Sequence, residues 1–248
     1  MTLSAIISDI EEKGFEITKC TVESGTDCTI SFRKPEQNST AHAATIIRSS
    51  ASKSELFSKV RDWCNLDEAD KHINAGDQIL IPSLSVPAML CEEEEFEEIN
   101  LQNIAVTAVH VEPNRVVFNF DDILFRHDID SKCSCKSFDK TPLGIYLTKH
   151  FADMLKEYKG NVKVSLLSRE NVFDENSKNF LPYFKPIKNR IKVLTNENDT
   201  WWWWLGTPYA SNSAAIGSVN VSGISSYVHA CISDGGVAPA FEITAESK

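Results

Sequence analysis

The sequence predicts an α+β fold of mixed, mainly antiparallel short strands with one or two helices, preceded by a small α/β module at the N-terminus. Three observations lead to this prediction. Apolar and polar residues alternate over short stretches separated by Gly, Pro, Asn and Asp, which is typical of paired strands. The longer stretches with helical spacing lie at 52–73 and 141–158. The pattern changes at Asn74-Ala-Gly-Asp77, which divides the chain into residues 1–75 and 76–248.

Residues 1–75 are predicted to form an α/β module for attachment or assembly. A short amphipathic helix is expected over 4–13, followed by paired strands over 15–22 and 28–33 with a turn between them. In the helix expected over 52–73, Ser52 or Ser54 can cap the N-terminus, and the apolar residues are spaced to form one buried face.

Residues 76–248 are predicted to form the second domain, with a different and strand-rich pattern. It is expected to begin with a short strand over 78–81 ended by Pro82, followed by a solvated acidic loop or edge over 92–98. A hairpin of 104–111 and 115–120 is expected next, around Glu112-Pro-Asn114. A helix over 141–158, a strand over 162–167 and a solvated basic stretch over 185–192 complete the predicted elements.

The overall charge narrows the classes of partner. The chain has 248 residues, with 25 Lys and Arg against 35 Asp and Glu, so its formal charge is −10, which excludes a basic nucleic-acid binder. No apolar run is long enough to insert into a membrane, and acidic residues interrupt the first residues before a signal peptide forms. The seven cysteines are an odd number without zinc-type spacing, so reduced thiols are expected, including the close pair Cys133-Ser-Cys135.

No recognisable motif indicates catalysis, so we expect no enzyme activity, no catalytic residues and no cofactor. The best metal candidate is His127 with Asp128 and Asp130, although adjacent polar residues on a turn usually face water. A metal hydrolase built on His127 and Asp128 would need a further ligand such as His110 or His150. The acidic residues Glu92–Glu95 lack the spacing of a calcium loop and are expected to face solvent.

Four consecutive tryptophans, Trp201–Trp204, point to a core strand. In a strand, two indoles face each side, so some can fill a core while others form a platform. Val237-Ala-Pro-Ala-Phe241 is suited to a further core strand with Pro239 at its edge. The residues expected to form the scaffold are Trp202, Trp203, Trp204, Pro208, Val237, Pro239 and Phe241.

Between these two motifs lies a stretch with almost no charge. The 27 residues Tyr209–Gly235 contain one acidic side chain, Asp234, and neither Lys nor Arg. Alternation at 218–221 and 226–232 predicts short strands, with turns at Gly223 and at 234–236. Ser, Gly, Asn and Tyr dominate antibody binding loops as well, so residues 209–235 are predicted to form a binding surface. Tyr227 and His229 are the strongest contact candidates.

Three motifs resemble an uncharacterised domain of bacteria and phages. Trp202-Trp-Trp-Leu-Gly-Thr-Pro208, the Ser/Asn stretch Tyr209–Ser213 and Gly236–Phe241 correspond to its W-W-L-R-S-P motif, its Asn/Ser/Gly-rich segment and its G-V-x-P-A motif. The resemblance covers about residues 76–243, and this chain has Gly206 where the family usually has Arg. That domain is similar to the C-type lectin-like variable proteins of diversity-generating retroelements, so a C-type lectin-like fold is implied for 76–248.

The resemblance also implies a function. Residues 209–235 would be rewritten by adenine-directed mutagenesis and would recognise a protein or glycan on a cell surface, as in a receptor or adhesin. The resemblance also allows a homo-oligomer or an assembly on a virion or cell surface, and it leaves the localisation open. The alternatives are a phage or virion structural protein without diversification and the metal hydrolase described above. The expected variable, ligand-binding positions are Ala214, Ala215, Ile216, Ser218, Ser222, Ile224, Ser226, Tyr227, Val228, His229, Ile232 and Asp234.

Overall fold

The chain divides into two compact units, Met1–Ser52 and Lys53–Lys248. The computed structural model describes residues 16–22, 28–33, 73–155, 161–195, 197 and 199–244. The helix predicted over 4–13, the turn 23–27 and most of the helix predicted over 52–73 lie outside the described residues. The domain boundary expected after residue 75 therefore stays a prediction.

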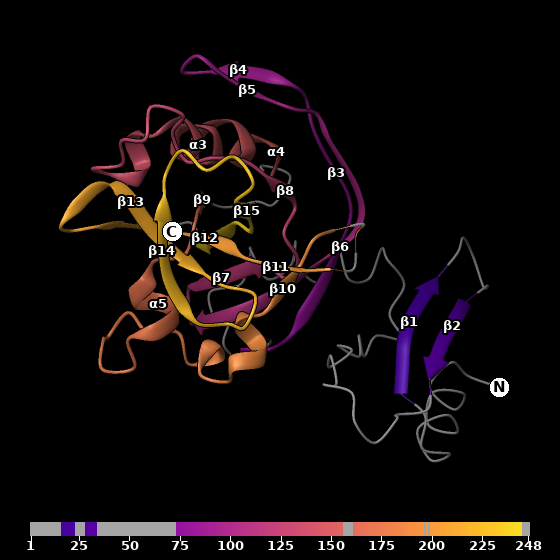
Figure 1. Cartoon of the computed structure of the whole chain (residues 1–248). Coiled ribbons are helices and arrows are strands. Elements are labelled where there is room, and N and C mark those ends of the chain that lie inside the picture. Colours follow the sequence, from indigo (N-terminus) through magenta and orange to yellow (C-terminus); the bar gives the residue numbers. More distant parts are fainter. Residues whose placement is uncertain are drawn as a thin grey trace. The chain divides into compact units, whose positions relative to one another are not determined.

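The first unit contains the predicted pair of strands. Strands β1 (Glu16–Val22) and β2 (Cys28–Arg33) are antiparallel, with Val22 opposite Cys28 at the turn end (Figure 1). The alternation of apolar and polar residues therefore predicted both the strands and their pairing.

The second unit is a mixed α+β structure built on two five-stranded sheets (Figure 1). In the first sheet every neighbour is antiparallel, and its order is β3 (Gln78–Val86), β6 (Ile99–Glu112), β7 (Arg115–Phe120), β16 (Ala240–Thr244) and β9 (Asn161–Ser165). The order of the second sheet is β14 (Ser225–His229), β13 (Asn212–Val219), β12 (Trp203–Tyr209), β15 (Gly236–Val237) and β8 (Phe125–Arg126), with β12 and β15 parallel.

Shorter elements connect and cover the sheets. They are the hairpin β4 (Met89–Cys91) and β5 (Glu94–Phe96), the pair β10 (Lys192–Val193) and β11 (Thr200–Trp201), helix α5 (Arg169–Phe173), and the 3-10 turns η2 (Phe138–Lys140), η4 (Pro182–Phe184) and η5 (Ile187–Arg190). None of the helices in the described residues is long and apolar enough to cross a membrane.

The helix predicted over 141–158 is present and is described as far as Leu155. It consists of α3 (Pro142–Ile145), the π-helical turn η3 (Tyr146–Phe151) and α4 (Ala152–Met154). Thr141 caps it by accepting a hydrogen bond from the Gly144 N–H, and Pro142 occupies the first helical position, where a missing N–H costs nothing. The predicted apolar face is buried against the first sheet, where Phe151 meets Phe120 edge to face.

The tryptophans alternate between two hydrophobic cores. Trp204 is buried in the core between the first sheet and the helix, and Trp202 packs at its margin. Trp203 is buried in a second core with Leu205 and Val219, and Trp201 packs against that one. Two indoles therefore face each side, as the sequence predicted.

Proline 82 does not end its strand, contrary to the prediction. Strand β3 continues from Gln78 to Val86 and pairs with β6 on both sides of Pro82. Among the described strands β3 is an edge strand, and an edge position tolerates a residue without an N–H donor. Asn103, which lies between the partners Ile104 and Gln102, has a positive φ of 55°. The ladder therefore adjusts locally and then continues.

Proline 239 also has a different role from the one predicted. It lies between β15 of the second sheet and β16 of the first, so the predicted single core strand is two strands in different sheets. The Pro239 carbonyl accepts hydrogen bonds from the Phe120 N–H and the Asn119 side chain. Because β16 lies between β7 and β9, Phe241 is buried as predicted, whereas Pro239 marks a crossing and not an edge.

Lysine 192 is buried, so the basic stretch 185–192 is not solvated throughout. Its ammonium donates to the carbonyls of Phe120 and Asp121 and lies 5.1 Å from the ring centre of Trp203. Burial lowers the pKa of Lys192 to about 8, although the nearby carboxylates oppose this shift. The sequence could not show this, because the carbonyl partners lie about seventy residues earlier in the chain.

Candidate functional site

The predicted variable positions lie on β13, β14 and the loops that follow these strands. Six of them are exposed, namely Ser222, Ile224, Tyr227, His229, Ile232 and Asp234. Three more are half-buried, namely Ala214, Ser226 and Val228. Among the other scaffold residues, Val237 is buried and Pro208 is half-buried on β12.

Three of the predicted contact positions, Ala215, Ile216 and Ser218, are buried in this structure, contrary to the exposure that a contact position needs. Strand β13 lies between β12 and β14 in the second sheet. Ile216 belongs to the larger core, and Ser218 is opposite Trp204 in the ladder. Both faces of β13 are therefore covered along this stretch, and small residues here serve packing.

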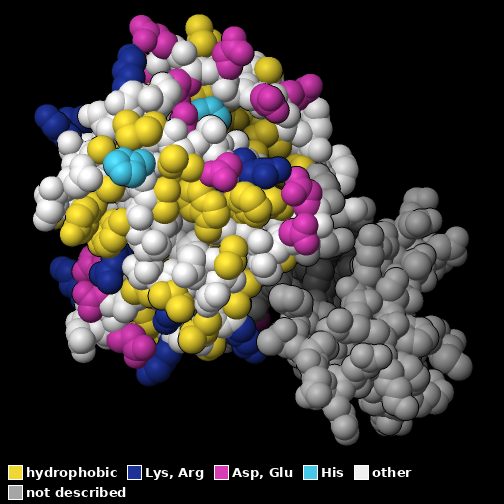
Figure 2. All heavy atoms as spheres, viewed as in Figure 1, with side chains coloured by type: hydrophobic (Ala, Val, Ile, Leu, Met, Phe, Trp, Pro, Cys, Tyr) yellow, Lys and Arg dark blue, Asp and Glu magenta, His cyan; other side chains and the backbone are white. Residues whose placement is uncertain are grey.

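The exposed apolar side chains concentrate in this part of the chain. Of the eight large hydrophobic residues that are exposed among the described residues, five lie between 209 and 232, namely Tyr209, Val221, Ile224, Tyr227 and Ile232. Figure 2 shows hydrophobic side chains gathered over the middle of one face, with most charged groups toward its rim. We call the set Tyr209, Val221, Ser222, Ile224, Tyr227, His229, Ile232 and Asp234 the C-terminal surface.

Hydrogen bonds and packing fix the backbone beneath the C-terminal surface. The rings of Tyr209 and Tyr227 lie 4.5 Å apart between centroids. In the turn before β14, the Asn220 side chain accepts hydrogen bonds from the N–H groups of Ser222 and Ile224. At the other end, the Trp201 indole donates to the Asp234 carbonyl at 2.8 Å. Such a surface is held in one conformation, which reduces the entropy lost on binding.

A disulfide also joins this region to the rest of the domain. Cys133 and Cys231 are bonded across 98 residues of sequence, with their Cα atoms 4.5 Å apart. The expectation of reduced thiols is wrong for this pair, while Cys91 and Cys135 are free and buried. Spacing could not identify the partner, because Cys231 lies far from the close pair Cys133 and Cys135.

The free thiol of Cys135 is expected to be unreactive in the folded protein. Burial, with a smaller contribution from Asp130, raises its pKa to about 11, and the thiolate is the reactive form. Iodoacetamide at about pH 8 should therefore leave Cys135 unmodified in the native state and modify it fully in denaturant. Peptide mass spectrometry measures both, and fast native alkylation would contradict the buried position.

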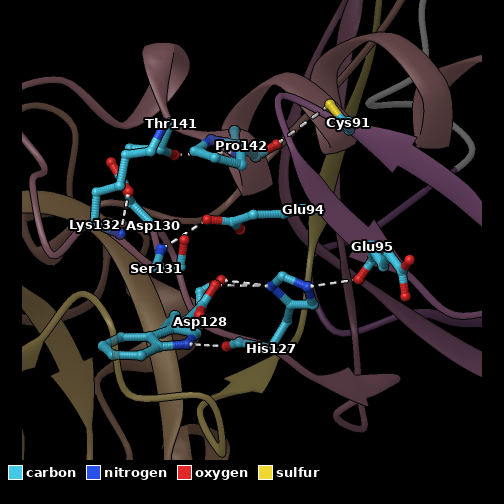
Figure 3. Close-up of polar contacts among 12 residues, drawn as sticks. Cys91, Glu94, Glu95, His127, Asp128, Asp130, Ser131, Lys132, Thr141 and Pro142 are labelled. Carbon is cyan, nitrogen blue, oxygen red and sulfur yellow. Dashed lines mark hydrogen bonds and ion pairs between the residues drawn. The ribbon is translucent and has the colours of Figure 1, made fainter.

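A second group of polar residues lies beside this region. The side chains of Glu94, His127 and Asp128 form what we call the acidic cluster, in which one ligand atom from each lies within 4.8 Å of the others. Figure 3 shows the His127 ring between Asp128 and Glu95, with Glu94 directed toward Ser131. His127 and Asp128 are the predicted metal candidates, and the structure adds Glu94 to them.

Residues 92–98 were predicted to form a solvated loop or edge, and most of them are exposed, but Glu94 and Phe96 point inward, which brings Glu94 to the cluster. The segment contains strand β5, which pairs with β4 through a turn at Glu92 and Glu93, both with positive φ. The burial of β5 alternates, so Glu94 and Phe96 face inward while Glu95 is exposed. Phe96 stacks between the rings of His127 and Tyr146, at 4.2 and 4.0 Å.

The contacts of the acidic cluster leave two carboxylate oxygens without hydrogen bonds. The Ser131 N–H donates to Glu94 Oε1 at 2.7 Å, and His127 Nδ1 lies 3.2 Å from Asp128 Oδ1. The other Glu94 oxygen, Oε2, and Asp128 Oδ1 are buried and accept no hydrogen bond. Burial, together with the Glu94 charge, raises the pKa of Asp128 to about 6.

The remaining predicted metal candidates do not supply ligand atoms to the acidic cluster. Asp130 accepts a hydrogen bond from the Lys132 N–H, and His110 pairs with Glu112 at 3.1 Å. Among the described residues, neither these side chains nor His150 of η3 belongs to the acidic cluster. The sequence contained one usable signal for Glu94, which is the alternation of Glu94 and Phe96 around an exposed Glu95.

Comparison with known protein families shows a similarity in the C-terminal part of the chain. The model of a family described as Domain of unknown function (DUF6273) matches residues 146–245. This range begins in η3 and takes in β9 to β16, and with them the whole C-terminal surface. No curated protein and no solved structure matches the chain.

Proposed function

We propose that the chain is a ligand-binding protein of the receptor or adhesin type, which recognises a protein or glycan on a cell surface through its C-terminal surface. One observation carries this proposal, which is the concentration of exposed large apolar side chains between 209 and 232. Tyr209 and Tyr227 are in contact at the surface, and grouped exposed apolar side chains are typical of interaction sites. The near absence of charge in 209–235 lowers the cost of removing water from this area.

The chemistry of the surface favours a protein ligand over a glycan. Tyr209 and Tyr227 offer adjacent ring faces, and Ile224 is 57% exposed. Aromatic and aliphatic groups of this kind act as anchors in protein interfaces. His229, Ser222 and Asp234 add hydrogen-bonding groups around them, which a sugar could also use.

The same arrangement supports diversification on a C-type lectin-like scaffold, which we include in the proposal. Exposed positions such as Ser222, Ile224 and His229 can change without altering the cores. The buried tryptophans, the disulfide and the turn at Asn220 hold the backbone beneath them. Substitution at the exposed positions would therefore change which ligand binds while the fold is retained.

Replacing Tyr227 by Ser is expected to weaken binding by about 30-fold, the equivalent of roughly 2 kcal/mol for an aromatic anchor. Because Tyr227 is 40% exposed, the change should alter stability little. The probes are a glycan array and a phage-displayed library of constrained peptides, from which binders of the wild-type chain are selected. The affinities of these binders are then measured for each variant.

The matched control is Leu90→Ser, because Leu90 is 69% exposed on the β4 strand and lies outside the C-terminal surface. Selected binders should retain their affinity for this variant. Binders that are insensitive to Tyr227→Ser and Ile224→Ser, or equally sensitive to Leu90→Ser, would show that recognition occurs elsewhere.

A further inference from the structure

We propose that the acidic cluster binds a divalent transition-metal cation of the Zn²⁺ or Mn²⁺ type. The three ligand atoms come from two separate segments, with Glu94 on β5 and His127 and Asp128 after β8. They lie within 4.8 Å of one another, so that small side-chain movements can bring all three to bonding distance from a common point. This inference does not depend on the proposed function.

A buried carboxylate oxygen without a hydrogen bond points to a ligand. Glu94 is only 9% exposed and its Oε2 accepts no hydrogen bond, while the neighbouring Asp128 Oδ1 is buried and lies 3.2 Å from His127 Nδ1. Buried acceptors without a partner cost free energy, and buried carboxylates are normally paired or bound to a metal. A cation at this point would satisfy both oxygens at once.

The orientation of His127 suits a metal ligand. Its Nε2 lies 3.2 Å from the Glu95 carbonyl and can donate an N–H there. Its Nδ1 faces two acceptors, the Asp128 carbonyl at 2.9 Å and Asp128 Oδ1 at 3.2 Å, so without a metal it carries a hydrogen, which a bound cation would displace. Metal-bound histidines commonly donate their other N–H to a carbonyl in this way. The stack on Phe96 fixes the plane of the ring.

The donor set selects the class of metal. Two carboxylates and one neutral imidazole carry a charge of −2, which a divalent ion balances. Mixed nitrogen and oxygen donors suit Zn²⁺ and Mn²⁺, whereas Ca²⁺ takes about six to eight oxygen ligands, and this cluster offers one oxygen each from Glu94 and Asp128. The nearby ammonium of Lys132 pairs with Glu93 at 2.9 Å and leaves Glu94 to the cation.

A bound cation would join two parts of the domain. It would tie the β4–β5 hairpin to residues 127–131, whose backbone is hydrogen-bonded to the last loop of the C-terminal surface. The His127 N–H donates to the Gly235 carbonyl, and the Ile129 N–H donates to the Ala230 carbonyl, at 2.9 and 2.8 Å. Metal binding should therefore stabilise the folded state.

The test is a titration of the full chain with Mn²⁺, followed by the electron paramagnetic resonance signal of the free ion. We expect one Mn²⁺ bound per chain, displacement by Zn²⁺ and a higher melting temperature with either metal. Glu94→Gln and Asp128→Asn should each weaken Mn²⁺ binding at least tenfold. Glu95→Gln is the control, since it removes an adjacent and exposed carboxylate and should leave the affinity unchanged.

Two results of the metal titration would overturn the proposed metal site. Absence of Mn²⁺ and Zn²⁺ binding by the folded wild-type chain overturns the proposal, and so does an equal loss of affinity in Glu95→Gln. Far-ultraviolet circular dichroism shows whether each variant is folded. If Glu94→Gln does not fold, Asp128→Asn performs the same test, because the Asp128 side chain is less buried than that of Glu94.

Discussion

Replacing Trp204 by Ala is expected to lower the free energy of unfolding by about 3–5 kcal/mol, the range for a large aromatic residue removed from a core. Trp204 is fully buried, its ring packs edge to face with that of Trp202 at 4.6 Å, and its indole donates to the His127 carbonyl at 2.8 Å. The substitution leaves a cavity and an unpartnered carbonyl. Urea denaturation followed by tryptophan fluorescence measures the loss.

Trp201→Ala is the matched comparison, because Trp201 is half-buried and packs at the edge of the second core beneath Arg126. Its loss of stability should be clearly smaller. Gly235→Ala tests the same packing from the other side, since a Cβ at Gly235 would lie 1.9 Å from the indole nitrogen of Trp204. Equal losses for the two tryptophans, or a neutral Gly235→Ala, would contradict the central position of Trp204.

Replacing Cys231 by Ser is expected to lower the free energy of unfolding by about 3–5 kcal/mol. The disulfide to Cys133 closes a loop of 98 residues, and a crosslink over a long loop removes much conformational entropy from the unfolded chain. Denaturation of the oxidised wild-type chain and of the variant gives the difference directly. The same loss should follow when the wild-type chain is unfolded in the presence of a reductant.

The control for the disulfide is the double variant Cys133→Ser with Cys231→Ser, whose stability should not respond to the reductant. Cys91→Ser changes a free cysteine that is also buried, so it should leave the effect of the reductant on stability unchanged. A wild-type chain that is equally stable with and without reductant would show that the disulfide contributes nothing.

Short sequence patterns correctly predicted the alternation of the tryptophans, the hairpin of β6 and β7, and the turn at Gly223. The alternation in Trp201–Trp204 predicted that two indoles face each side, and the structure distributes them between two cores. The hairpin of β6 and β7 follows the predicted apolar stretches around Pro113. The turn at Gly223, with a φ of 75°, separates β13 from β14 as expected. In each case the pattern on which the prediction rests lies within a short stretch of sequence.

The remaining features depend on partners distant in sequence. A proline such as Pro82 usually ends a strand unless the strand lies at the edge of its sheet. The edge position of β3 is set by the order of all five strands, which a local pattern does not contain. Glu94 looks like a solvated residue in an acidic run until His127 and Asp128 are placed beside it. Ile216 and Ser218 have the composition of a binding loop, yet β12 and β14 enclose their strand.

The position of β16 in the first sheet limits the order in which the domain can fold. Among the described strands, β9 pairs with β16 alone, and Ser165 lies opposite Ala240. Strands β3, β6 and β7 can associate through hairpins as soon as they are synthesised, whereas β9 has no place in the sheet until residues 240–244 arrive. Closing so long a loop is slow. We therefore expect β9, together with its buried Val164, to be exposed to unwanted pairing during most of synthesis.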